Sequence, residues 1–432
     1  METLSLLYQE LRRLPRGNVY KKVIAGKTYF YHQYFQQGKR YSRLVPKEEI
    51  EALREAITRR KEIERLIAAK QGKAVTLSPS AKALTGTLMN GNDPVATFQE
   101  GVLTWMDEQR APLSVKRTHS LETFLSLRVL DMSRTNARIL KKILHIDVEE
   151  DYKAALYTYA LSVYDRYWFK PKHSKLTYDG LALRSDALFD TSLKGEINVF
   201  YGSGRLSPEL TTVGSFEKGW RYLDGTWWLY KSGNPAQIFS ELFCSAFARL
   251  IGVPTVSYEY EEGYIRCPNF SPETNFEPIA ALAGSNEDYG FLFSMLLELR
   301  EDLAKEYLRL SFFDAVVNNV DRHNENLGLL RDPSTSHILS LAPNFDDNLA
   351  LVATSPRLND NPTKDGFMNL FARFIESEDE ARRLFLTLSF PAITLEQIQG
   401  IVDAIPIDIE GKEAIASAVL SRYDGLLRRL NK

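Results

Sequence analysis

The sequence has little cysteine and no long apolar segment. Cys244 and Cys267 are its two cysteines among 432 residues, too few for a disulfide framework or a zinc knuckle. Such a content is typical of a reducing cytosol, where thiols stay free. No apolar run reaches the roughly 18 residues that a membrane span needs, and the first residues lack the pattern of a signal peptide. We therefore expect a cytoplasmic protein that does not contact a membrane.

The composition is that of a globular protein, with 44% hydrophobic and 11% aromatic residues. The length predicts two or three domains. The net charge of −2 is unevenly distributed, because residues 1–70 carry 16 Lys and Arg but 8 Asp and Glu. This asymmetry indicates that the N-terminal segment meets an anionic partner.

Residues 1–70 predict a small basic module of three strands and a helix. Apolar and polar residues alternate around Gly26 and Gly38, which predicts three short strands with tight turns. The helix is expected to begin at Pro46. Its apolar positions fall on one face, and they are Ile50, Leu53, Ile57 and Ile67.

Lysines and arginines alternate with tyrosines over residues 16–43. The segment resembles the three-stranded DNA-contacting modules of some recombinases, and its charge suits contact with DNA phosphates. The alternative is a solvated sheet that docks on the acidic remainder of the same chain.

The remaining chain is expected to contain four parts. Residues 71–92 are small, polar and aperiodic, and predict a linker. Residues 93–204 predict a mainly helical subdomain, in which one helix spans 151–170 and stops at Pro171. Residues 205–275 predict strands, an amphipathic helix and a hairpin, and residues 276–432 are mainly helical. The aromatic residues of the 151–170 helix are interpreted as core rather than as a nucleobase platform; they are Tyr164, Tyr167, Trp168 and Phe169.

Lys231 ends an apolar strand, where a lysine needs an anionic partner or a route to solvent. Glu241 lies near the apolar face of the next predicted helix. Protein kinases use such a Lys–Glu ion pair to hold nucleotide phosphates. The alternative is a snorkelling lysine and an ordinary helical glutamate. Upstream, Gly214 and Gly219 would let backbone N–H groups approach phosphate oxygens.

The stretch NNVDRHNENLGLL places short polar side chains between two apolar runs. Asp321 can accept the proton of an attacking hydroxyl, and Asn326 offers an oxygen to Mg²⁺. Arg322 and His323 can position this loop by hydrogen bonds. A second metal carboxylate is expected in NFDDN, at Asp346 or Asp347. Each motif alone is typical of a polar turn, but their joint order predicts a kinase.

These residues resemble the HipA-like kinase family, which are bacterial toxin-type serine/threonine kinases. TTVGSFEK looks like the phosphate loop, NNVDRHNEN like the catalytic loop, and APNFDD like the metal motif with its aspartate at Asp346. The similarity covers about residues 205–350. It implies an α+β, two-lobed protein-kinase-like fold with a helical C-lobe, an extra helical N-terminal subdomain, and the basic module at the N-terminus.

The resemblance implies ATP and Mg²⁺ as cofactors, with Asp321 as catalytic base and Asn326 and Asp346 as metal ligands. The segment 265–270 would be the hinge facing adenine through its backbone. The implied nucleotide-binding residues are Gly214, Ser215, Lys218, Lys231, Glu241, Arg266, Cys267, Asn269, Phe270 and His323. Thr211, with Thr212 beside it, falls where the family carries an autophosphorylated serine.

The expected reaction is transfer of the ATP γ-phosphate to a serine or threonine of a protein. The resemblance further implies a growth-inhibiting toxin that modifies a translation component and has an antitoxin partner. Two alternatives stay open. One is a small-molecule or lipid kinase, because the Asp-Arg-His-x-x-Asn motif also resembles phosphoinositide-type lipid kinases. The other is a non-catalytic kinase-like module that binds DNA or protein.

Overall fold

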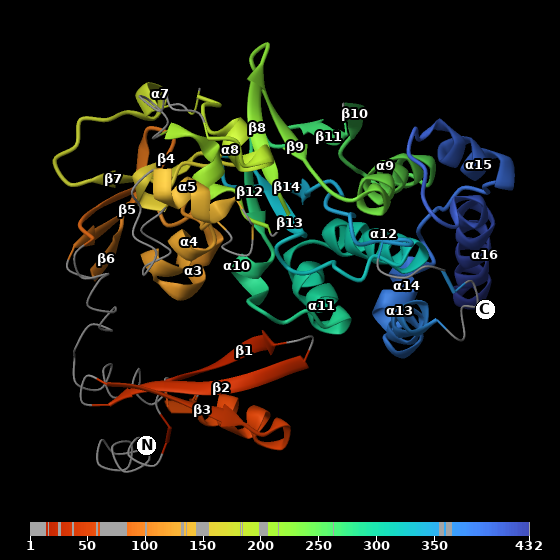
Figure 1. Ribbon diagram of the computed structural model, residues 1–432, viewed down its shortest axis with the longest axis horizontal. Coiled ribbons are helices and arrows are strands. Elements are labelled where there is room, and N and C mark those ends of the chain that lie inside the picture. Colours follow the sequence, from red (N-terminus) through yellow and green to blue (C-terminus); the bar gives the residue numbers. More distant parts are fainter. Residues whose placement is uncertain are drawn as a thin grey trace. The chain divides into compact units, whose positions relative to one another are not determined.

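The computed structural model describes residues 14–15, 17–24, 27–36, 39–57, 59–60, 84–99, 102–130, 134, 136–143, 155–181, 183, 185–197, 206–214, 216–261, 263–353, 358–359 and 365–431 (Figure 1). The chain divides into two compact units. One comprises residues 1–85 with 98–102, and the other comprises 86–97 with 103–432. Within the described ranges, no helix combines the length and the apolar character needed to cross a membrane.

The first unit contains the three strands and the helix that the sequence predicts. Its antiparallel sheet has the order β1-β2-β3, followed by a helix over 50–57 and 59–60. The strands are β1 (Asn18–Ile24), β2 (Lys27–Gln36) and β3 (Lys39–Val45). Ile50, Leu53 and Ile57 are buried and form one cluster with Val19, Phe30 and Val45. The helix therefore covers one face of the sheet; Gly26, Gly38 and Ile67 lie outside the described residues.

The second unit begins with a four-stranded sheet of order β6-β5-β4-β7. Its strands are β4 (Gly86–Asn90), β5 (Asp93–Gln99), β6 (Val102–Trp105) and β7 (Tyr167–Pro171). Short helices accompany it: α3 (Leu113–Thr118), α4 (Leu121–Ser126), α5 (Ala137–Ile143), α7 (Tyr178–Leu181) and α8 (Phe189–Lys194). The prediction of a linker is thus wrong for residues 86–92, which form β4 and its turn. Between residues 93 and 204, the described residues are not mainly helical.

The predicted helix over 151–170 is also wrong in its described part, where residues 155–157 alone are helical. Tyr159 and Ala160 take positive φ angles of 56° and 59°, which end the helix. Trp168 pairs with Met89 of β4, and its indole N–H donates to the Gly91 carbonyl at 2.6 Å. Bulky aromatic residues pack well on a pleated sheet, and here this packing overrides the helical spacing.

Two further sheets follow, and both are small and antiparallel. The first has the order β10-β11-β9-β8 and the second the order β12-β13-β14. Their strands are β8 (Lys218–Leu223), β9 (Thr226–Lys231), β10 (Glu259–Glu261), β11 (Tyr264–Pro268), β12 (Asn275–Pro278), β13 (Gly328–Arg331) and β14 (Ile338–Leu341). Helix α9 (Pro235–Leu250) begins with a capping box at Asn234 and is followed by Gly252 at φ 77°.

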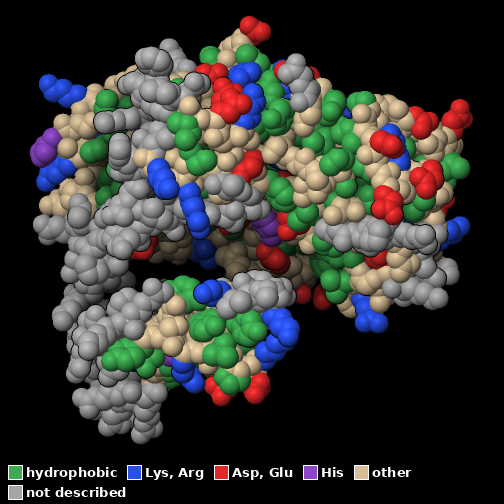
Figure 2. Space-filling model, viewed as in Figure 1, with side chains coloured by type: hydrophobic (Ala, Val, Ile, Leu, Met, Phe, Trp, Pro, Cys, Tyr) green, Lys and Arg blue, Asp and Glu red, His purple; other side chains and the backbone are tan. Residues whose placement is uncertain are grey.

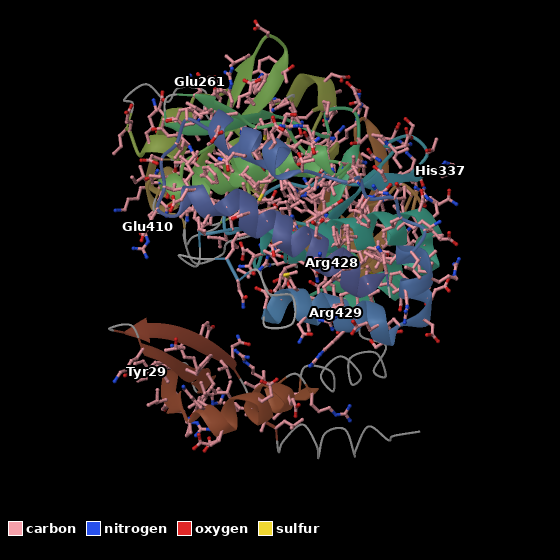
Figure 3. All side chains as sticks on the ribbon, turned by 90° about the vertical axis from the view of Figure 1, so that its right-hand side faces the viewer. Tyr29, Glu261, His337, Glu410, Arg428 and Arg429 are labelled. Atoms are coloured by element: carbon pink, nitrogen blue, oxygen red, sulfur yellow. The ribbon has the colours of Figure 1, made fainter. Side chains whose placement is uncertain are left out.

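Apart from α10 (Ala280–Ala283), which lies beside α3, the C-terminal helices gather on the side of the second unit away from the β6-β5-β4-β7 sheet (Figure 1). They are α11 (Tyr289–Leu299), α12 (Glu301–Val317), α13 (Gly366–Ser377), α14 (Asp379–Phe385), α15 (Leu395–Ala404) and α16 (Lys412–Leu430). One large apolar cluster joins them to α9. At the surface, Arg429 of α16, labelled in Figure 3, pairs with Glu376 of α13 at 2.7 Å.

We predict that Phe312→Ala lowers the free energy of unfolding by about 3–5 kcal/mol. Phe312 on α12 is fully buried, and four aromatic rings lie 4.4–6.4 Å from its own. Truncation leaves a cavity that these rings cannot close. Urea unfolding measures the effect. The control Leu370→Ala removes a side chain that is 56% exposed and should cost less than about 0.5 kcal/mol. Equal losses for the two variants would contradict the assignment of this core.

Candidate active site

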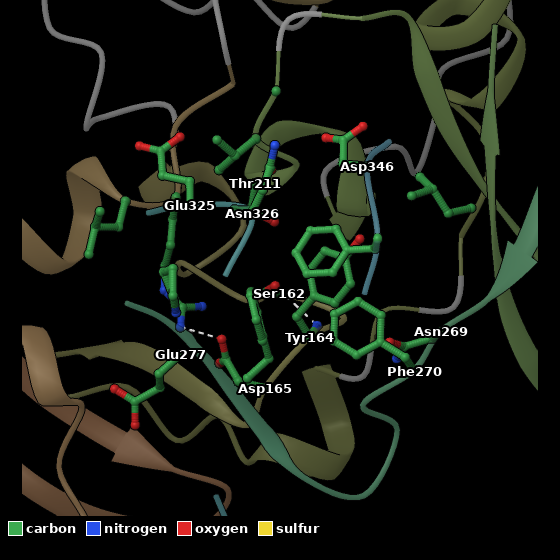
Figure 4. Close-up of a pocket in the computed structure, with 18 of the residues that line it drawn as sticks. Ser162, Tyr164, Asp165, Thr211, Asn269, Phe270, Glu277, Glu325, Asn326 and Asp346 are labelled. Atoms are coloured by element: carbon green, nitrogen blue, oxygen red, sulfur yellow. Dashed lines mark hydrogen bonds and ion pairs between the residues drawn. The ribbon is translucent and has the colours of Figure 1, made fainter. Parts of the chain in front are cut away.

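One pocket of about 210 Å³ brings together most of the residues that the sequence predicts for a site (Figure 4). The predicted residues that line it are Thr211, Gly214, Lys218, Lys231, Cys267, Asn269, Phe270, Asp321, His323, Asn326 and Asp346. Thr212, Glu241 and Arg266 do not line it. Ser215 lies outside the described residues.

Strand alternation directs two lysines toward this pocket. Lys218 of β8 and Lys231 of β9 are directly paired in the antiparallel register, so their side chains share one face of the sheet. Trp220 and Leu229, also paired, follow on the same face and line the pocket. The apolar part of this face therefore lies beside its cationic end.

Lys231 lies between two carboxylates. Its Nζ donates to Glu241 Oε1 at 2.5 Å and to Asp346 Oδ1 at 2.6 Å, and Tyr258 Oη accepts at 3.3 Å. Burial alone would lower the pKa of Lys231, but Asp346 and Glu241 hold it well above its ordinary value. The ion pair with Glu241 that the sequence predicts is present, and the pair with Asp346 is an addition to it.

The ammonium of Lys218 lies against Gly214 of the predicted phosphate loop, where a larger residue would not fit. The φ of Gly214 is +106°, and a Cβ atom there would lie 2.3 Å from Lys218 Nζ. The Lys218 ammonium donates no hydrogen bond to any described residue, although its side chain is buried. Burial lowers its pKa to about 8, and Lys231 and Arg134 act in the same direction against Asp346. An ammonium without a partner at a pocket wall suits a phosphate ligand.

Both threonines predicted for autophosphorylation are buried and hydrogen-bonded around η4 (Pro208–Thr211). Thr211 Oγ1 donates to the Leu161 carbonyl at 2.7 Å. Thr212 Oγ1 donates to the Pro208 carbonyl at 2.8 Å and accepts from the Trp220 indole at 2.9 Å. Neither hydroxyl can receive a phosphate unless these bonds open.

Arg322 fastens the catalytic loop to the neighbouring loop that holds Asp346. Its guanidinium donates to both Asp314 oxygens at 3.0 Å and to Asp347 Oδ1 at 2.8 Å. It also donates to the carbonyls of Asn326 and Phe345, at 3.0 and 2.8 Å, and to the side chain of Asn344. The positioning role predicted for Arg322 thus has its contacts. Asp314 was missed, although an aspartate inside the apolar run FFDAVV is a visible signal.

The two adjacent aspartates have different surroundings. Asp346 takes a positive φ of 64° and lines the pocket. Asp347 is fully buried and accepts hydrogen bonds from Asn319, Arg322 and Asn344. Burial raises the pKa of Asp347 to about 6 despite the nearby Arg322. Asp346 is therefore the carboxylate that a ligand can reach, in agreement with the alignment of the APNFDD motif.

The residues of the predicted catalytic loop also line the pocket; they are Asp321, His323 and Asn326. Burial raises the pKa of the half-buried Asp321 above its ordinary value, while His323 lowers it and Asp346 raises it further. The Asn326 side-chain amide donates to the Asp321 carbonyl at 3.4 Å. Its Oδ1 accepts no hydrogen bond from the described residues and lies at the pocket. His323 Nδ1 accepts from the Glu325 N–H at 3.2 Å, which shapes the loop.

The side chain of Arg266, which was predicted among the nucleotide-binding residues, does not line the pocket. Alternation along β11 directs Cys267 into the pocket and Arg266 to the other face. There Arg266 pairs with Glu259 at 2.9 Å and Glu261 at 2.5 Å. In addition, the Asn269 N–H already donates to the Trp227 carbonyl at 2.8 Å.

The donor set fits Mg²⁺ held together with a nucleotide. Asn326 and Asp346 both offer oxygen to the pocket, and Mg²⁺ is usually held by one or two protein oxygens, substrate phosphates and water. No group of three or more His, Cys, Asp or Glu side chains in the described ranges is arranged to hold a metal alone. The site therefore suits a shared Mg²⁺ rather than a closed structural metal.

The pocket continues past Asp321 to a wall that the sequence did not predict. This wall contains Ser114, Leu127, Arg128, Ser162, Tyr164, Asp165 and Glu277 (Figure 4). Arg128 pairs with Asp165 at 2.5 Å. The wall is tied to the β12-β13-β14 sheet, because the Leu113 N–H donates to Glu277 at 2.5 Å and Arg331 bonds to the Gln109 carbonyl at 3.0 Å.

No family model matches the sequence, and no curated protein matches it. Several solved structures are similar, among them the following two. One is the proinflammatory kinase CtkA of Helicobacter pylori, at 16% identity and a TM-score of 0.38, over 50% of this chain and 94% of that one. The other is HipA of Shewanella oneidensis MR-1 with HipB and operator DNA, at 14% identity and a TM-score of 0.49, over 80% and 97% of the two chains. At these TM-scores the likeness establishes no assignment, and the chemistry of the site rests on its own residues.

We predict that Lys218→Met stabilises the ligand-free protein at pH 7 by on the order of 1–3 kcal/mol, because it removes a buried charge without a partner. The pKa of Lys218 falls from 10.5 in the unfolded chain to about 8 in the folded protein. The unfolded state therefore holds the extra proton between these values, and wild-type stability rises with pH through that window.

Urea unfolding at pH 7 and pH 10 tests this prediction. The advantage of Lys218→Met over wild type should shrink at pH 10. Lys175→Met removes an exposed lysine outside the pocket and should change stability by less than about 0.5 kcal/mol at both pH values. A pH-independent difference for Lys218→Met would contradict the desolvated ammonium.

Proposed function

We propose that the second unit is an ATP- and Mg²⁺-dependent phosphotransferase with a two-lobed, protein-kinase-like arrangement. The observation that carries the proposal is the position of Lys231. It bonds both Glu241 and Asp346, while Asp321 and Asn326 line the same pocket. A lysine steadied by a helix glutamate, beside a base and two oxygen ligands, is the set that phosphoryl transfer needs.

In this proposal Lys231 and Lys218 hold the phosphates of ATP. Glu241 keeps Lys231 charged and fixed, so the lysine remains paired when phosphate oxygens replace Asp346 as its other partner. Asn326 and Asp346 would hold Mg²⁺, which neutralises charge on the phosphates when bound. The ammonium of Lys218, which donates no hydrogen bond to a described residue, would gain a partner on nucleotide binding.

Asp321 acts as the base. It orients the acceptor hydroxyl and accepts its proton, while the hydroxyl oxygen bonds to the γ-phosphorus and the bond to the bridging oxygen breaks, which releases ADP. Burial raises the pKa of the Asp321 carboxyl, and a base whose pKa lies nearer to neutral is better matched to proton transfer. Arg322 positions the loop and does not itself touch the reacting atoms.

The proposed acceptor is a serine or threonine of a protein, as the similarity of the motifs to HipA-like kinases implies. A toxin role, a translation component as substrate and an antitoxin partner belong to the same proposal. Self-phosphorylation of Thr211 or Thr212 would require their buried hydrogen bonds to break, and would thereby open the loop that precedes Gly214.

A second candidate is a small-molecule kinase, and the wall beyond Asp321 favours it. Because that wall is tied to the β12-β13-β14 sheet, an acceptor hydroxyl must enter a recess rather than lie on an open surface. A small alcohol, or one protruding side chain, meets this condition.

A non-catalytic module is less consistent with the pocket, because the base, the lysine and both metal ligands line it together.

A phosphotransfer assay with labelled ATP, Mg²⁺ and a cell extract tests the proposal. We expect Asp321→Asn and Asp346→Asn each to lose transfer by at least about 100-fold. By calorimetry, Asp346→Asn should also lose Mg²⁺-dependent ATP binding. Asp408→Asn alters an exposed carboxylate outside the pocket and should match wild type.

Transfer that persists in Asp321→Asn would remove the base assignment. Absence of Mg²⁺-dependent ATP binding by wild type would contradict the phosphotransferase itself. Binding of ATP without label on any protein would favour the small-molecule acceptor.

For the first unit we propose contact with duplex DNA. The strand register places Tyr20, Tyr31 and Leu44 in one row across the sheet, on the face opposite the one that the helix covers. Tyr20 and Leu44 are 49% and 54% exposed. Lys22 and Lys27 belong to the same face by alternation. Figure 2 shows hydrophobic side chains with lysines and arginines beside them on this unit, and Figure 3 labels Tyr29 on β2.

We predict that the full chain binds duplex DNA with an affinity that falls as salt rises, because lysines on phosphates release counterions. Lys22→Ala with Lys27→Ala should reduce the slope of log affinity against log salt by about 2. Lys47→Ala, exposed on η1 (Lys47–Glu49) beyond the sheet, is the matched control. Fluorescence anisotropy at several salt concentrations measures the slopes. Salt-independent binding, or none, would remove this proposal.

A further inference from the structure

Tyr164 lies in the pocket, although it precedes β7 and belongs to the β6-β5-β4-β7 part of the unit (Figure 4). Its backbone is fixed to the segment after the hinge. The Asn269 side chain donates to the Val163 carbonyl at 2.7 Å. Ser271 Oγ and the Phe276 N–H both donate to the Tyr164 carbonyl at 2.9 Å. These bonds make the Tyr164 backbone a fixed part of the pocket rather than a detachable segment.

The Tyr164 ring stands between the two small sheets that bound the pocket. Its centroid is 5.2 Å from Trp220 of β8 and 5.8 Å from Phe276 of β12. Phe270, the last residue of the expected hinge, lies at 5.2 Å. Protein kinases hold a nucleobase between their strand lobe and helical lobe beside the hinge, so an aromatic ring at this level must contact a bound base or exclude it.

The phenol of Tyr164 lacks a hydrogen-bond partner in the part of the chain that the structure describes. Burial, with Cys267 and Asp346, raises the pKa of Tyr164 far above its ordinary value, so the phenol keeps its proton, although Lys231 acts against this. The pocket that Tyr164 lines also contains Cys267, Phe270 and Lys231. A hydroxyl at a pocket wall needs a partner from a ligand or from water.

We propose that Tyr164 is a nucleotide-recognition residue. Its ring forms one wall of the slot for the base, and its hydroxyl donates a hydrogen bond to the bound nucleoside triphosphate. This inference rests on the proposed phosphotransferase function and adds a recognition residue from outside the motifs. It also makes the N-terminal part of the second unit necessary for nucleotide affinity.

Calorimetry with Mg²⁺ and a non-hydrolysable ATP analogue tests the inference. Tyr164→Phe keeps the ring and loses the hydroxyl, and we expect about 3- to 10-fold weaker binding, the range for one hydrogen bond. Tyr164→Ala also removes the aromatic wall and should weaken binding more than about 10-fold. In transfer assays the KM for ATP should rise for Tyr164→Phe while kcat changes little, because the hydroxyl serves binding rather than chemistry.

Tyr178→Phe is the matched control, because Tyr178 stacks on Arg166 at 5.1 Å and does not line the pocket. Its affinity should equal that of wild type. Unchanged binding by Tyr164→Phe would overturn the proposed hydrogen bond to the nucleotide. Tighter binding by Tyr164→Ala would overturn the aromatic wall and identify Tyr164 as a side chain that blocks the slot. In either case wild type still binds and transfers phosphate. Failure of wild type to bind the analogue would instead overturn the proposed function and this inference with it.

Discussion

The site depends on one buried cation, the guanidinium of Arg322. It joins helix α12 through Asp314, the catalytic loop through the Asn326 carbonyl, and the following loop through Asp347 and the Phe345 carbonyl. A buried guanidinium is tolerable only when it is fully paired, so these segments must keep their places together. As a consequence, Asp321 and Asp346 face one pocket although they lie on different loops.

The two lysines of the pocket differ in their partners, and the less well paired one favours an anionic ligand. Lys231 has Glu241 and Asp346 as partners, whereas Lys218 has no hydrogen-bonding partner among the described residues. Desolvation of Lys218 therefore opposes folding in the free protein, and a phosphate would relieve that cost. Glycine at position 214 makes the arrangement sterically feasible, since any side chain there would meet the ammonium.

Much of this site could be predicted from sequence because its residues sit in local patterns. The run TWWLYK specifies a strand ending in Lys231, and Asp-Arg-His-x-x-Asn places its polar side chains on one loop. What could not be predicted depended on non-local pairing. The Arg266 side chain points away from the pocket because the direction of each side chain on β11 follows from its register with β9. Residues 86–92 were predicted as a linker because they contain several glycines and asparagines. The same residues are equally typical of a hairpin turn, which they form here. The aromatic run around Trp168 fits a helix or a strand, and pairing with β4 decides between them.

Tyr164 shows why such failures matter for function. From the sequence it is one aromatic among several, and burial in a core is the ordinary outcome for the group. Trp168 and Phe169 follow that rule. Tyr164 departs from it because it lines the pocket, and its carbonyl is held there by Ser271 and Phe276. The side chains of Ser162, Tyr164 and Asp165 thus belong to the pocket as much as the motif residues do. A fragment that begins at residue 205 would keep every motif and lose this wall, so the complete pocket is a property of the whole second unit.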